Sequence, residues 1–118
     1  MTDILPVIAE LLKDIAPVEL TFYDAERHVP VLVLSLLDNS SDIILSGKNR
    51  FSRISIQVDV YADDAQTAML MAGEANRLLA SKGIKRTFCR LITDEDVPRI
   101  CMRYGFGLDE ITGRTVSF

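Results

Sequence analysis

The clearest pattern in the chain is an alternation of apolar and polar residues at positions 53–60. Ile54, Ile56, Val58 and Val60 are separated by single polar or charged residues. Because successive side chains of a strand point to opposite faces, this spacing predicts a half-buried β-strand. Residues 84–92 and 99–108 predict two more strands, which the acidic turn at residues 93–98 would join as a hairpin.

Residues 4–15 have helical spacing. Their apolar side chains recur at steps of three and four, Thr2 or Asp3 can cap the first turn, and Pro6 is tolerated there. Pro17 is expected to stop this helix.

A second helix is predicted at residues 64–82, with Asp63 or Asp64 as its cap and Gly83 at its end. It has a stripe of mostly small side chains, namely Ala65, Ala68, Ala72, Ala75 and Leu79. We expect this stripe to pack on the chain's own sheet, with a helix-to-helix contact between subunits as the alternative. Met69 borders the stripe and is expected in the core, whereas Met71 is expected outside it.

Four further segments lie between and after these elements. Residues 18–23 alternate as a strand does, and residues 29–37 are almost continuously apolar, which favours a strand covered on both faces. Residues 38–50 are rich in turn formers and predict a long loop or a projecting hairpin. Residues 112–118 can add a short edge strand. The fold class is therefore α+β, with the order α-β-β-β-α-β-β and both helices on one face of a largely antiparallel sheet.

Length and charge restrict the classes of protein to which the chain can belong. A chain of 118 residues with 48% hydrophobic content is typical of a single folded domain, here residues 1–118. The net charge of −4 disfavours general binding to nucleic acid, and no sequence-specific binding is expected. A local basic patch could still form from Arg50, Arg53, Arg86, Arg90, Arg99 and Arg103. No apolar run is long enough to cross a bilayer and no basic leader precedes residues 1–15, so a cytoplasmic protein without membrane association is expected.

No group of residues matches a catalytic or metal-binding pattern. His28 is the single histidine, and Asp94, Glu95 and Asp96 lack the spacing of a calcium loop. The Gly105–Phe106–Gly107 segment lies in a strand pattern, so it opens no phosphate-binding helix. Cys89 and Cys101 are expected to be reduced, buried thiols. We therefore expect neither an enzyme nor a cofactor.

Several segments together resemble the tail terminator, or tail completion, proteins of long-tailed bacteriophages and prophages. The resemblance covers most of the chain and is clearest at IQVDVY (56–61) with the helix that follows it, at GIKRTF (83–88), and at RYGFGLD (103–109) followed by TG. It extends to the first helix and to VPVLVLSLL (29–37).

The resemblance implies a structural protein that forms a homo-oligomeric ring, typically a hexamer, at the end of the tail tube. Such a ring stops tube growth and offers the surface that joins the head, so the implied partners are further copies, the tail tube protein and a head-completion protein. Assembly would take place in the bacterial cytoplasm, and the product would be part of the virion tail. Another head-tail connector component and a small-ligand-binding regulatory module are the alternatives.

Candidate contact residues follow from exposure and composition. In the segment 38–50, the apolar residues need a partner and the basic residues could meet an acidic neighbour, whereas Leu70 lies opposite the alanine stripe. The candidates are Ile43, Ile44, Leu45, Lys48, Arg50 and Leu70. The segment 38–50 is expected to become ordered on assembly, unless it is a hairpin that folds onto its own subunit.

Overall fold

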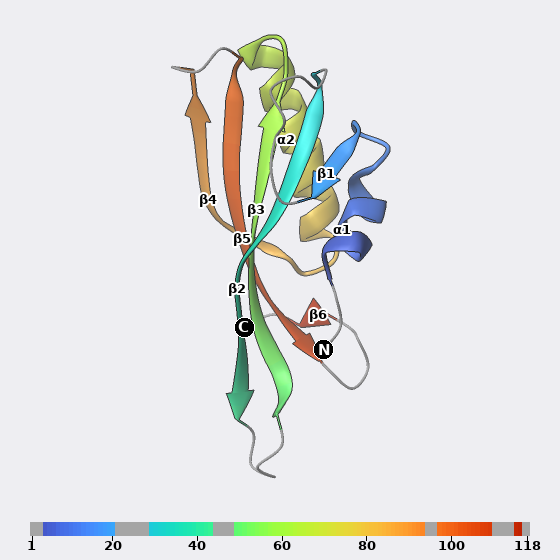
Figure 1. Cartoon of the computed structure of the whole chain (residues 1–118), viewed down its shortest axis with the longest axis vertical. Helices are drawn as coiled ribbons and strands as arrows, with labels where there is room; N and C mark the ends of the chain where they lie inside the picture. Colours follow the sequence, from blue (N-terminus) through green and yellow to red (C-terminus); the bar gives the residue numbers. More distant parts are fainter. Residues whose placement is uncertain (1–3, 21–28, 44–48, 94–96, 110–114, 117–118) are drawn as a thin grey trace.

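The described elements of the computed structural model form one twisted sheet and a layer of two helices (Figure 1). The structure describes residues 4–20, 29–43, 49–93, 97–109 and 115–116, with the backbone alone at 38–43, 49–52, 108–109 and 115–116. The elements are α1 (Leu5–Leu12), β1 (Val18–Leu20), β2 (Val31–Ile43), β3 (Asn49–Tyr61), α2 (Ala65–Ala80), β4 (Lys85–Ile92), β5 (Arg99–Asp109) and β6 (Thr115–Val116).

The strands lie in the order β1-β2-β3-β5-β4, and β6 pairs with the end of β5. Every one of these pairings is antiparallel except that of β1 with β2, which is parallel. The predicted α+β class, the order of elements and the hairpin of the last two long strands are therefore confirmed.

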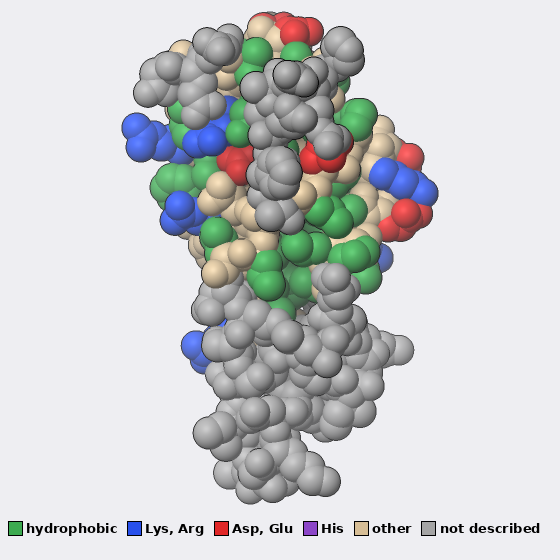
Figure 2. All heavy atoms as spheres, in the orientation of Figure 1, with side chains coloured by type: hydrophobic (Ala, Val, Ile, Leu, Met, Phe, Trp, Pro, Cys, Tyr) green, Lys and Arg blue, Asp and Glu red, His purple; other side chains and the backbone are tan. Residues whose placement is uncertain are grey.

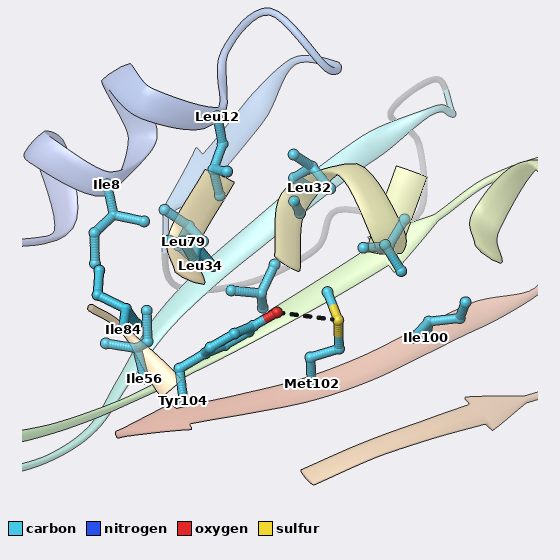
Figure 3. Packing of buried hydrophobic residues seen from close by; sticks show 14 of the residues in the cluster. Ile8, Leu12, Leu32, Leu34, Ile56, Leu79, Ile84, Ile100, Met102 and Tyr104 are labelled. Atoms are coloured by element: carbon cyan, nitrogen blue, oxygen red, sulfur yellow. Dashed lines mark hydrogen bonds between the residues drawn. The ribbon is translucent and has the colours of Figure 1, made fainter. Parts of the chain in front are cut away.

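The alternating strand predicted from the sequence is the centre of the sheet. Apolar side chains of β3 point to the helices and are buried, and their partners on β5 are buried beside them. The paired residues are Ile54 with Phe106, Ile56 with Tyr104, Val58 with Met102, and Val60 with Ile100. Two strands thus supply most of the floor on which the helices pack (Figure 3).

Helix α2 begins at the cap that its sequence predicts and ends two residues before Lys82, the predicted last residue. The carboxylate of Asp64 accepts a hydrogen bond from the backbone N–H of Thr67 at 2.7 Å, and Gly83 adopts a positive φ of 77° just past the helix. The stripe is buried at Ala68, Ala72, Ala75 and Leu79. Its small side chains let the helix axis approach the sheet closely, so packing within the subunit is confirmed.

The two methionines of α2 were assigned the wrong way round. Met69 is 58% exposed, whereas Met71 is half-buried and packs against the core. The reason is α1, which lies beside α2 and covers the flank that carries Met71 (Figure 1).

Helix α1 is shorter than expected. The backbone N–H of Ile15 donates to the carbonyl of Leu12 at 3.0 Å, so a tighter three-residue turn ends the helix well before Pro17. Its N-cap is Ile4, and the expected caps Thr2 and Asp3 lie outside the described residues. Neither α1 nor α2, the helices in the described part of the chain, is long and apolar enough to span a membrane.

Residues 38–50 are mostly strand, which corrects the expectation of a long loop and agrees with the alternative of a projecting hairpin. β2 continues to Ile43 and β3 begins at Asn49, and these two residues face each other across the ladder. Backbone pairing within one chain therefore runs through most of a segment that was expected to become ordered on assembly. In Figure 1 this hairpin extends beyond the end of the helix layer.

Tyr104 is the largest fully buried side chain in the core. Its hydroxyl hydrogen-bonds to Asn76 Oδ1 at 3.1 Å and lies 3.4 Å from Met102 Sδ (Figure 3). Burial raises the pKa of Tyr104 to about 12, because the phenolate would lose its hydration.

This pKa predicts a loss of stability in alkali. A tyrosine in the unfolded chain ionises near pH 10, so between about pH 10 and 12 the unfolded state has lost a proton that the folded state keeps, and the free energy of unfolding falls as pH rises. Tyr104→Phe should remove this contribution, roughly 2 kcal/mol, while costing about 1 kcal/mol near pH 8 through the lost hydrogen bond to Asn76. Urea unfolding of the wild type and of Tyr104→Phe between about pH 8 and 12 measures the free energy of unfolding and checks this prediction. An equal alkaline slope in the two proteins would contradict it.

Candidate interaction surfaces

The face of the sheet opposite the helices, here called the open face, bears most of the charged side chains of β3, β4 and β5. Register places Gln57, Asp59 and Tyr61 of β3 beside Arg103, Cys101 and Arg99 of β5 on this face. Phe88 and Arg90 of β4 continue the same rows. The open face therefore combines cations with aromatic rings.

The basic patch expected from the sequence forms in part. Register puts Arg53, Arg90, Arg99 and Arg103 together on the open face. Arg86 lies on the helix side of β4, opposite Tyr104, because a register shift between Arg86 and Phe88 reverses the alternation of side chains. For Arg50 only the backbone, within β3, is described.

A chain of polar contacts crosses the open face. Gln57 Nε2 donates to Asp59 Oδ2 at 2.8 Å, and Arg103 Nε donates to Gln57 Oε1 at 3.4 Å. On the other side, Asp59 Oδ1 lies 3.6 Å from Arg99 Nε, and Arg99 Nη1 donates to the Tyr61 hydroxyl at 3.4 Å. Since Asp59 is buried, its carboxylate contacts these neighbours instead of water, and the contacts fix the positions of both arginines.

Aromatic rings support the same two arginines. The guanidinium of Arg103 lies 5.1 Å from the centre of the Phe88 ring, and that of Arg99 lies 6.0 Å from the centre of the Tyr61 ring. Near Tyr61 the open face is covered, since Val31 and Val33 are buried there and pack with Val29 and Val97. Near Arg53 and Arg103 it is exposed. The accessible part of the patch therefore contains Arg53, Arg90 and Arg103.

The two cysteines lie in different surroundings, which corrects the expectation of two buried thiols. Cys101 is buried on the open face, whereas Cys89 is exposed on β4. Burial raises the pKa of the Cys101 thiol, and the nearby Asp59 carboxylate raises it further.

Thiol labelling should separate the two cysteines. Because the thiolate is the reactive form, we expect a thiol reagent to modify one thiol per chain quickly in dilute native protein and the second only after unfolding. Cys89→Ser should abolish the fast reaction and leave the slow one. Two fast thiols in the native wild-type protein would contradict the buried position of Cys101.

A groove of about 1300 Å³ lies between α1 and α2. Its floor is apolar and includes Ile8, Leu11 and Leu78, whereas charged side chains form the rim. The rim carries two exposed ion pairs, Glu10 with Lys13 and Glu74 with Arg77. These charges are already paired within their own helices, so the groove presents mainly apolar surface to a partner.

Leu70 lies on this groove, with its side chain 70% exposed. The placement near Glu74 and Arg77 that helical geometry predicted is the one observed. Of the other candidates, Ile43 and Arg50 lie in the paired strands of the hairpin, and Ile44, Leu45 and Lys48 lie outside the described residues. The structure therefore places Leu70 on α2, in the helix layer, and the backbone of Ile43 and of Arg50 on β2 and β3.

The outer edge of β4 was not identified from the sequence. Side chains along this strand are exposed almost throughout, including Phe88 and Leu91 at 40% and 41%. The only signal was the run KRTFCR, in which cations flank an aromatic residue, and a hairpin strand was the simpler interpretation.

No group of His, Cys, Asp or Glu residues that could hold a metal ion occurs in the part of the chain that the structure describes. His28 and the acidic residues 94–96 lie outside that part. A scan against protein-family models and a search of curated proteins found no match to this chain.

Proposed function

We propose that this chain is a structural tail protein of a bacteriophage or prophage, which assembles into a closed ring at the end of the tail tube. The resemblance in the sequence and the exposed surfaces of the subunit support this function. In a ring each copy uses two different surfaces, because a head-to-tail interface joins one side of a subunit to the other side of the next. The tail tube protein and a head-completion protein would then bind the two ends of the ring.

The observation behind the proposal is that apolar side chains are exposed at both edges of the sheet and on the helix layer. A single exposed leucine is common, but exposed residues at two opposite edges suit a subunit with a neighbour on each side. These residues are Leu20, Leu36 and Leu37 at the β1–β2 edge, Phe88 and Leu91 at the β4 edge, and Val7, Met69 and Leu70 on the helices.

The experiment is the mass of the protein in solution. We expect sedimentation and native mass spectrometry to give a species of about six copies of the 13.2 kDa chain, and negative-stain images to show rings. A chain that stays a monomer or dimer at every concentration would overturn the proposal.

A monomer would support the second candidate, a small-ligand-binding regulatory module. The observation that favours it is the groove between α1 and α2, which has an apolar floor and a charged rim. A ring would favour the first candidate, in which a partner protein occupies this groove.

Leu70→Glu should weaken assembly or partner binding without unfolding the subunit, because it places a charge at the apolar groove and leaves the core untouched. The matched control is Met69→Glu, since Met69 is similarly exposed on the same helix but does not line the groove. Sedimentation measures the fraction of each variant that is assembled. The free energies of unfolding in urea should differ by less than about 0.5 kcal/mol between the two variants. Equal assembly of both variants would remove Leu70 from the interface.

A further inference from the structure

Besides the short outer edges of β1 and β6, two longer strand edges of the sheet have no strand partner in the described part of the chain. One is the outer side of β4, whose single partner is β5. The other is the outer side of β2 at residues 35–43, because β1 pairs only with Leu32, Val33 and Leu34. β4 has eight residues and this part of β2 has nine, so the two edges have matching lengths of roughly 26–30 Å.

The two edges also differ in charge. β4 contains Lys85, Arg86 and Arg90 and no acidic residue. Residues 35–43 contain Asp38 and Asp42 and no basic residue. Figure 2 shows Lys and Arg side chains gathered on the side of the molecule where Figure 1 places β4.

Exposed apolar side chains accompany the charges on both edges. Leu36 and Leu37 are 46% and 47% exposed at the start of the β2 edge, and Phe88 and Leu91 are similarly exposed on β4. An exposed strand edge that also shows apolar side chains is a template for pairing with another chain. Each edge therefore lacks what the other supplies: backbone partners, opposite charge and apolar cover.

We infer that β4 of one copy pairs with residues 35–43 of the next copy, and that this contact is the head-to-tail interface of the proposed ring. The inference rests on the proposed function and identifies the two surfaces through which neighbouring copies in the ring would bind each other.

The direction of pairing follows from the fold. β2 is antiparallel to β3, β3 to β5, and β5 to β4, so β4 runs antiparallel to β2 within one subunit. β4 lies level with residues 31–38 of β2 across the sheet, so the ring axis must be inclined to the strands, and rotation about it shifts β4 along its neighbour towards residues 35–43. Such a rotation keeps the relative strand directions. β4 of one copy therefore meets β2 of its neighbour as an antiparallel strand, and the sheet continues from copy to copy.

Charge also excludes the wrong partner. Two β4 edges would bring their cations together, and two β2 edges would bring their aspartates together, so pairing of like edges into a two-fold dimer is opposed. Only unlike edges attract each other, which selects the head-to-tail contact that a ring requires.

The test uses two charge-reversed full-length chains. Variant A carries Lys85→Glu and Arg90→Glu, and variant B carries Asp38→Lys and Asp42→Lys. Each alone should need about tenfold or more protein for half-maximal assembly, because its two edges now have the same charge. An equimolar mixture should assemble as the wild type does, in rings where A and B alternate. Asp63→Lys, a reversal of an exposed charge outside both strand edges, is the control and should assemble normally.

Cys89 gives a second measurement that needs no charge variant. It lies exposed on β4, so its labelling in wild-type protein should slow several-fold when rings form, and amide exchange at residues 35–43 should slow with it. Rings that form equally well from A alone, or rings in which Cys89 keeps its monomer reactivity, would overturn the edge pairing and leave the proposed function standing. A wild-type chain that never forms rings would overturn the proposed function itself.

Discussion

Close packing of the α2 alanine stripe on β3 and β5 is the contact on which the rest of the structure depends. Ala68, Ala72 and Ala75 bring the helix close to the sheet, and Leu79 fills the space nearer to α1. Side chains of both strands alternate strictly between the two faces of the sheet. The residues next to each apolar residue in this contact therefore lie on the opposite face. The helix layer therefore decides which residues form the open face: the polar chain around Asp59 and the arginines stacked on Phe88 and Tyr61.

The parts of the fold with a strong local period could be predicted from the sequence. Positions 53–60 and the α2 stripe each repeat one periodicity long enough to fix the type of element and its buried side. The hairpin strands at 38–43 and 49–50 could not, because Asn, Ser and Asp are turn formers by local preference. There, backbone pairing across a long antiparallel ladder outweighs that preference, in line with the strong dependence of strand propensity on context.

The candidate surfaces were less predictable than the fold, since they depend on how distant strands align. Leu70 was recoverable, because one helical period places it opposite the alanines. The contacts of Asp59 with Gln57 and Arg99 follow from the pairing of β3 with β5, which no local pattern encodes. The exposed edge of β4 follows from the strand order: β5 lies between β3 and β4, so the last-but-one long strand becomes the rim of the sheet.

The register shift at Thr87 changes which residues of β4 share a face of the sheet. Before it, Lys85 lies on the open face and Arg86 on the helix side; after it, Phe88 and Arg90 lie on the open face, although three and five residues separate them from Lys85. Because Thr87 has no partner on β5, Lys85, Phe88 and Arg90 share one side of the strand although no regular two-residue spacing connects them. Deleting Thr87 would leave a regular ladder in which Lys85 still lies opposite Gly105, Arg86 opposite Tyr104 and everything after them in place. A regular ladder that kept Thr87 would instead place Arg86 on the open face and Lys85 on the helix side, so the bulge decides how positive charge is distributed between the two sides of this strand.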